Sequence, residues 1–118
     1  MAGDQNTTTV TYTKTTLPPA ENVDMASTLK ELGALLRQLR SEEMPFMESA
    51  LEEAEHHLAK PEPDKDRIGQ ALDRALDYAS TAEGFVDTVS KLVPHVKGAC
   101  AWLGKNWYKL LGFVGLMV

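Results

Sequence analysis

The chain has 118 residues, of which 43% are hydrophobic and 25% are charged, a composition that indicates one globular domain and excludes a wholly disordered protein. Its net charge of -5 is unevenly distributed, because residues 1–87 hold 17 acidic and eight basic residues, whereas residues 88–118 hold four lysines and no acidic residue. The acidic body argues against nucleic acid as a partner, and the single cysteine excludes an intramolecular disulfide.

Residues 1–19 form a threonine-rich segment that we expect to be an extended arm. From Thr7 to Lys14, threonines alternate with Val10 and Tyr12, and this period of two favours a β-strand. One strand is unstable by itself, so the arm is either a disordered polar segment or a strand that pairs with the arm of another copy. The first residues have neither the basic start nor the apolar core of a signal peptide, so we expect a cytoplasmic location.

Two segments with the spacing of amphipathic helices follow the arm. The first is expected over residues 27–40, where Thr28 and Glu31 have the spacing of a capping box. Its apolar side chains follow the three-four spacing of a heptad seam and would bury one face of the helix. This leucine seam consists of Leu29, Leu32, Leu36 and Leu39. The second helix is expected to begin at Pro45, which suits a first helical turn, and to continue to Leu58.

Two prolines in residues 60–64 end the second helix, and Asp64 or Asp66 would cap a third. Apolar side chains then continue with helical spacing past Gly84, so one long helix and a helix broken at Gly84 both remain open. The positions after the glycine are Phe85, Val86, Val89, Leu92 and Val93. Pro94 is expected to open a fourth helix. These segments predict an all-α fold over residues 20–97, either an antiparallel helical hairpin or a small three- or four-helix bundle.

Residues 98–118 form a basic, aromatic C-terminal segment, which we call the tail; it holds both tryptophans and ends in an apolar run from Leu110. Such an end is seldom left in water, so we expect the tail to pack on the bundle, on a second copy or on a membrane surface. The run is too short to span a membrane, which takes about 20 residues, but lysines beside an apolar face are typical of an interfacial helix. The candidate interface residues are Leu29, Leu32, Leu36, Leu39, Trp102, Leu103, Trp107, Leu110, Leu111 and Val114. The candidate membrane-contacting residues are Lys105, Trp107, Tyr108, Lys109 and Phe113.

Three groups of side chains have the spacing of functional sites but lack the partners that such chemistry needs. Glu53 and His56 have the spacing of a di-iron motif, of which the sequence holds no second copy. Cys100 has no base and orienting group near it in the sequence, and Asp73 and Asp77 form an exposed pair at i, i+4. We therefore expect no catalytic residue, no metal site, no cofactor and no enzymatic activity.

A Gly-Asp opening at residues 3–4, a leucine-rich helix from Ser27-Thr-Leu-Lys30, a proline-acid joint at residues 60–64 and an alanine-rich third helix follow one another in this chain. This order resembles the helical-hairpin modules attached to bacterial effector, pentapeptide-repeat and conflict-system proteins, in loose pattern over residues 3–103. The resemblance implies a self-association or adaptor module of a bacterial defence or stress assembly, forming a homo-oligomer or binding another protein. The leucine seam and the tail would then be its interface. The alternative is a membrane-active effector whose released tail binds or permeabilises an anionic membrane, with the protein peripheral at the inner face.

Overall fold

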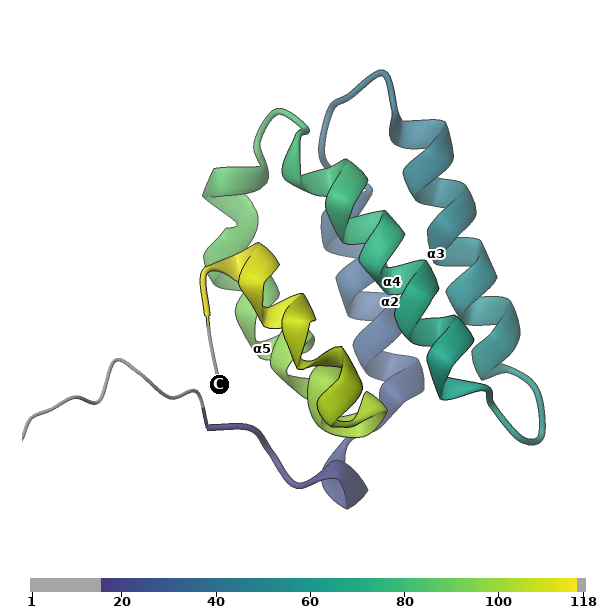
Figure 1. Cartoon of the computed structure of the whole chain (residues 1–118). Coiled ribbons are helices and arrows are strands. Elements are labelled where there is room, and N and C mark those ends of the chain that lie inside the picture. Colours follow the sequence, from purple (N-terminus) through teal and green to yellow (C-terminus); the bar gives the residue numbers. More distant parts are fainter. Residues whose placement is uncertain (1–15, 117–118) are drawn as a thin grey trace, which may run out of the picture.

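The computed structural model describes residues 16–116, which form four α-helices and two 3₁₀-helices (Figure 1). The α-helices are α2 (Met25–Leu36), α3 (Met44–Leu58), α4 (Lys65–Ser80) and α5 (Phe85–Leu103), and the 3₁₀-helices are η2 (Ala20–Asn22) and η3 (Lys105–Val114). The predicted all-α class is confirmed for this part of the chain. The strand expected in the arm falls in residues 1–15, outside the described residues, and residues 16–19 are in neither helix nor strand.

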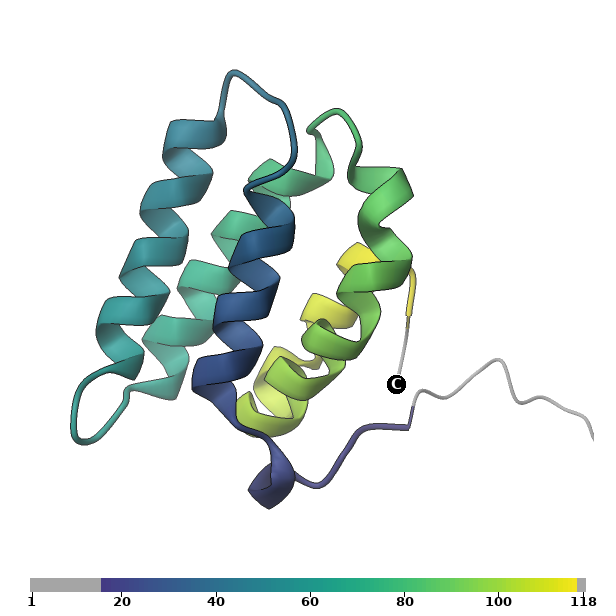
Figure 2. The same ribbon diagram turned by 180° about the vertical axis from the view of Figure 1, so that it is seen from behind.

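Consecutive helices of the bundle run antiparallel, as the short connections between them require (Figures 1 and 2). α3 packs mainly on α4 and α2 packs mainly on α5, while η3 folds back along α5 and also contacts α4. α3 and the α5–η3 pair therefore lie on opposite sides of the bundle (Figures 1 and 2).

The two loops at one end of the bundle are joined to each other. The backbone N–H of Glu83 donates to the carbonyl of Arg40 at 2.9 Å, and the N–H of Arg40 donates to the carbonyl of Glu83 at 3.3 Å. This antiparallel bridge fixes the α2–α3 loop against the α4–α5 loop. The beginnings of α3 and α5 and the end of α4 consequently lie at the same end of the molecule.

The start expected for the first helix was wrong, because Asp24 caps it earlier in the chain. The Asp24 carboxylate accepts from the backbone N–H of Ser27 at 3.2 Å, and these contacts to Ser27 hold the pKa of Asp24 below its usual value. The helix also ends at Leu36 and not at Arg40. Leu39 is nevertheless buried, so all four seam leucines lie in the core.

The starts expected for the second and third helices are confirmed. Pro45 lies in the first turn of α3, where its missing N–H leaves no intrahelical bond unmade. Asp64 caps α4 by accepting from the N–H groups of Asp66 and Arg67 at 3.1 and 3.2 Å. Both signals depend only on residues within one helical turn.

The helix is interrupted at Gly84, which separates α4 from α5 and adopts the left-handed conformation with a φ of 91°. Pro94 lies inside α5, so the prediction that it opens a fourth helix was wrong. Leu92 and Val96 are buried on either side of it, and their packing keeps both halves of α5 against the core despite the lost backbone hydrogen bond. Because the expected domain boundary at residue 98 falls inside α5, the tail consists of the end of α5 followed by η3.

Candidate functional site

The tail is folded back onto the bundle by a turn at Gly104. Its φ of 103° and ψ of 177° belong to a region that is open essentially to glycine alone. After this turn, residues 105–114 form a single 3₁₀-helix, although such helices are uncommon beyond three or four residues. The tail therefore holds a conformation that depends on what it packs against.

Trp107 is the main anchor of the tail and is only 7% exposed. Its indole N–H donates to the Asp66 carboxylate, with a nitrogen–oxygen distance of 3.2 Å. The indole ring lies directly over Gly69 on α4, where a Cβ atom would overlap it. The missing side chain of Gly69 thus creates the space that Trp107 fills.

Cys100, near the end of α5, connects this helix with η3. Its thiol donates to the carbonyl of Trp107, with a sulfur–oxygen distance of 3.4 Å, and the side chain is fully buried. Burial raises the pKa of this thiol to about 12, because ionisation would place a charge in an apolar core. Cys100 is therefore a neutral, structural thiol at physiological pH.

Lys65 connects the beginning of α4 with the end of α5. Its ammonium group donates to the Trp102 carbonyl at 2.8 Å and lies 4.6 Å from the centre of the Trp102 ring. Trp102 is half-buried, so this contact lies at the edge of the core. It fixes the last turn of α5, from which the tail turns back.

The candidate interface residues are occupied by contacts within the chain itself. The four seam leucines and Leu103, Trp107, Leu110, Leu111 and Val114 are all buried in one apolar core, and Trp102 packs against it. A partner could contact them only if the bundle opened or if copies exchanged helices.

The candidate membrane-contacting residues are divided between the inner and outer sides of η3. Trp107 is buried, Lys105 and Lys109 are exposed, and Tyr108 and Phe113 are half-buried. The Lys109 ammonium group lies 4.9 Å from the centre of the Trp107 ring and covers it from outside. We call the surface formed by Lys105, Tyr108, Lys109 and Phe113 the outer face of η3.

A second surface feature is an aromatic pair at the end of the bundle where the α2–α3 and α4–α5 loops meet. The rings of Phe46 on α3 and Tyr78 on α4 are stacked, with centroids 5.8 Å apart and planes at 26°. Phe46 is 59% exposed although it is a large apolar side chain. The exposed carboxylates of Glu42, Glu43 and Asp77 neighbour the pair in the sequence and on the same helix ends. We call these five residues the acidic aromatic patch.

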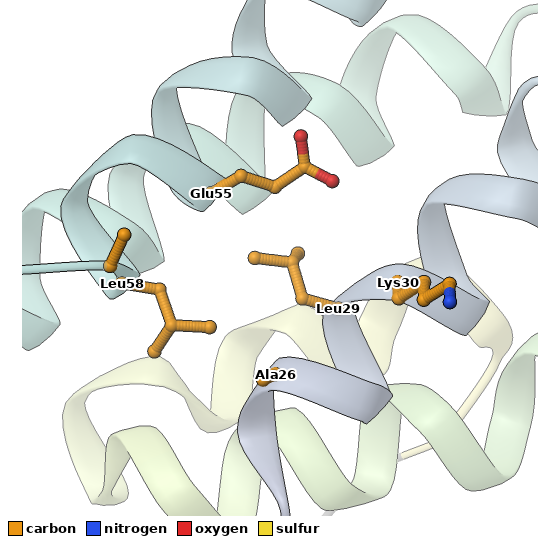
Figure 3. Close-up of a pocket in the computed structure, with 6 residues that line it drawn as sticks. Ala26, Leu29, Lys30, Glu55 and Leu58 are labelled. Carbon is orange, nitrogen blue, oxygen red and sulfur yellow. The ribbon is translucent and has the colours of Figure 1, made fainter.

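An apolar groove of about 460 Å³ lies between the beginning of α2 and the end of α3 (Figure 3). Leu29 and Leu58 lie on its opposite walls, and Lys30 and Glu55 stand at its edge (Figure 3). The two helices are held together further along, where the Arg37 guanidinium contacts Glu48 and lies 3.8 Å from Glu55. The groove thus forms where α2 and α3 diverge locally, although the contacts of Arg37 still hold the two helices together.

The residues with metal-ligand chemistry are dispersed over the structure. His56 is exposed and His57 half-buried, and their rings meet edge to face at 5.5 Å. Within residues 16–116, no three histidine, cysteine, aspartate or glutamate side chains gather in an arrangement suited to a metal ion. Glu53 instead pairs with Arg74 at 2.6 Å. None of the helices in the same range is long and apolar enough to cross a membrane.

In comparisons with known proteins, no family model, no curated protein and no solved structure matched this chain. Its site is therefore interpreted from the geometry alone. Asp66 and Gly69 are not recognisable from the sequence as the residues on which Trp107 packs, since no local pattern connects residues so far apart. Val86 was expected on the core stripe, but its side chain is 84% exposed.

Proposed function

We propose that the chain is a non-enzymatic module that associates with copies of itself, as part of a bacterial defence or stress assembly. The observation that carries the proposal is the exposure of Phe46, which stacks on Tyr78 at the surface of the bundle. Exposed aromatic side chains in a cluster are typical of surfaces that contact another protein. The attribution to a defence or stress assembly rests on the resemblance of the helix pattern alone.

The proposed interface is the outer surface of the closed bundle. The leucine seam and the buried side of the tail already contribute to the core of the single chain. Using them for association would cost about 1.5–3 kcal/mol for each large side chain taken out of that core before a partner covered it. Residues exposed in the monomer carry no such cost.

The experiment is multi-angle light scattering on the purified full chain over a wide concentration range. We expect the mean mass to rise from that of a monomer toward at least that of a dimer as concentration increases. A mass that stays monomeric at the highest soluble concentration would rule the proposal out.

A second candidate function, a membrane-active effector with a releasable tail, is favoured by the 3₁₀ conformation of η3. If residues 105–114 left the bundle and became α-helical, Trp107, Leu110, Leu111 and Val114 would form an apolar side beside two lysines. Hydrogen bonds in a 3₁₀-helix have poorer geometry than those in an α-helix, which lowers the cost of releasing this segment.

Flotation of vesicles that contain anionic lipid tests this second function. We expect Gly69→Ala to increase vesicle binding, because it removes the seat of Trp107, and Trp107→Ala combined with Leu111→Ala to abolish binding. Lys105→Ala combined with Lys109→Ala should weaken binding to anionic vesicles and leave binding to neutral ones unchanged. If even Gly69→Ala stays unbound on anionic vesicles, the tail is not a membrane element.

A further inference from the structure

The described surface separates charge of opposite sign between the two sides of the bundle. α3 carries four glutamates and no lysine or arginine, whereas η3 carries two exposed lysines and no acidic residue. Glu48 and Glu53 are neutralised by Arg37 and Arg74. The carboxylates of the acidic aromatic patch, by contrast, are exposed and have no salt bridge within residues 16–116.

From this arrangement we propose that the acidic aromatic patch of one copy binds the outer face of η3 of another copy. The inference rests on the proposed self-association and names its two surfaces. Each surface offers what the other lacks: the patch has three exposed carboxylates and an exposed ring, and the outer face of η3 has ammonium groups and half-buried rings. Lysines can contact both the carboxylates and the faces of Phe46 and Tyr78.

A second copy fits the outer face of η3 better than a lipid surface does while the tail is docked. The side chains that would enter a bilayer, Trp107, Leu110 and Leu111, are then turned into the core. What remains outside is charge and the exposed parts of Tyr108 and Phe113, which suit a polar protein contact that includes aromatic side chains.

Charge reversal on each surface, and then on both together, provides the test in the full chain by light scattering. Glu42→Lys with Asp77→Lys makes the patch basic, and Lys105→Glu with Lys109→Glu makes the outer face of η3 acidic. Each pair alone should weaken association at least about tenfold, because like charges then oppose each other. The chain with all four changes should associate more strongly than either pair alone, since charges of opposite sign then face each other again.

Matched controls separate the proposed contact from a general effect of charge or of lost apolar surface. Glu21→Lys with Glu31→Lys makes the same change of net charge on η2 and α2, and α2 lies on the side turned toward the viewer in Figure 2. It should leave association unchanged. Phe46→Ser should weaken association, whereas Val86→Ser, which removes an even more exposed apolar side chain outside the patch, should not.

The outcomes distinguish this inference from the proposed function on which it rests. A wild-type chain that stays monomeric contradicts both. A wild-type chain that associates equally well with either reversed surface, or a fourfold variant that stays monomeric although it is folded by circular dichroism, overturns the inference and leaves self-association standing. If the reversed η3 loses vesicle binding but keeps association, its outer face serves a membrane and the inference is also overturned.

Discussion

Gly69 sets how closely the tail can approach α4, because the Trp107 ring fills the space that a side chain would occupy. Gly69→Ala should destabilise the fold by about 1–3 kcal/mol through overpacking, offset by up to about 1 kcal/mol from the better helix propensity of alanine. The control is Gly112→Ala, because a Cβ atom at that position meets nothing within 4 Å. Urea unfolding that shows an equal effect for both variants would contradict the proposed seat of Trp107.

The Cys100 thiol makes stability depend on pH in the alkaline range. Its pKa is raised from 9.0 to about 12 by burial, so the unfolded chain loses this proton at lower pH than the folded chain does. The contribution of the neutral thiol is therefore complete below about pH 9 and is lost as the pH rises toward about 12. Between about pH 8 and about pH 10.5, the wild type should lose about 2 kcal/mol more unfolding free energy than Cys100→Ala. Parallel pH profiles for the two chains would exclude this role.

At the scale of elements, the joint between α5 and η3 depends on the backbone of Gly104. Its φ of 103° with a ψ of 177° costs another residue about 1–3 kcal/mol, although a Cβ atom there would meet no neighbour within 4 Å. Gly104→Ala should therefore strain the turn without disturbing any packing. We expect faster cleavage of the tail by protease at low enzyme concentration, with α2, α3 and α4 remaining protected. An unchanged cleavage rate would show that the turn does not hold the tail.

The elements that sequence predicted well are those whose signals are local. Pro45 and Asp64 act within one turn of the helices they begin, so their roles follow from spacing alone. The role predicted for Pro94 was wrong because the free energy that a proline costs a helix is outweighed here by the burial of Leu92 and Val96. That burial depends on the whole bundle. Packing of the tail on the bundle was one of three alternatives that the sequence left open, since the contact that decides between them joins Trp107 to Asp66 across 41 residues of sequence.

At the scale of the whole molecule, the assembled bundle decides which apolar side chains are buried in the core and which stay exposed at the surface. The leucine seam was predicted as a buried stripe, and the structure buries it within one chain. Phe46 is also a large apolar side chain, yet it lies outside the core, because α3 turns Met47 and Ala50 inward instead. Apolar periodicity identifies the residues that leave water, but only the assembled bundle shows which of them remain available to a partner.

Docking of the tail should also make the bundle unfold as one unit, and two spectroscopic probes can check this. The only two tryptophans of the chain, Trp102 and Trp107, lie at the tail, whereas far-ultraviolet circular dichroism reports mainly on the four α-helices. Leu110 and Leu111 are at most 1% exposed and share the core with α4 and α5, so the tail and the helices should lose their packing together.

In the wild type, the fluorescence and circular dichroism transitions in urea should therefore coincide. In Gly69→Ala, the fluorescence midpoint should move below the circular dichroism midpoint, because the indole leaves its seat while the helices remain. Gly112→Ala should keep the two transitions together. If the wild-type transitions already separate, with fluorescence changing first, η3 is an independent unit held only by its polar contacts to Asp66 and Cys100. Its release would then cost less than the burial of its apolar side suggests.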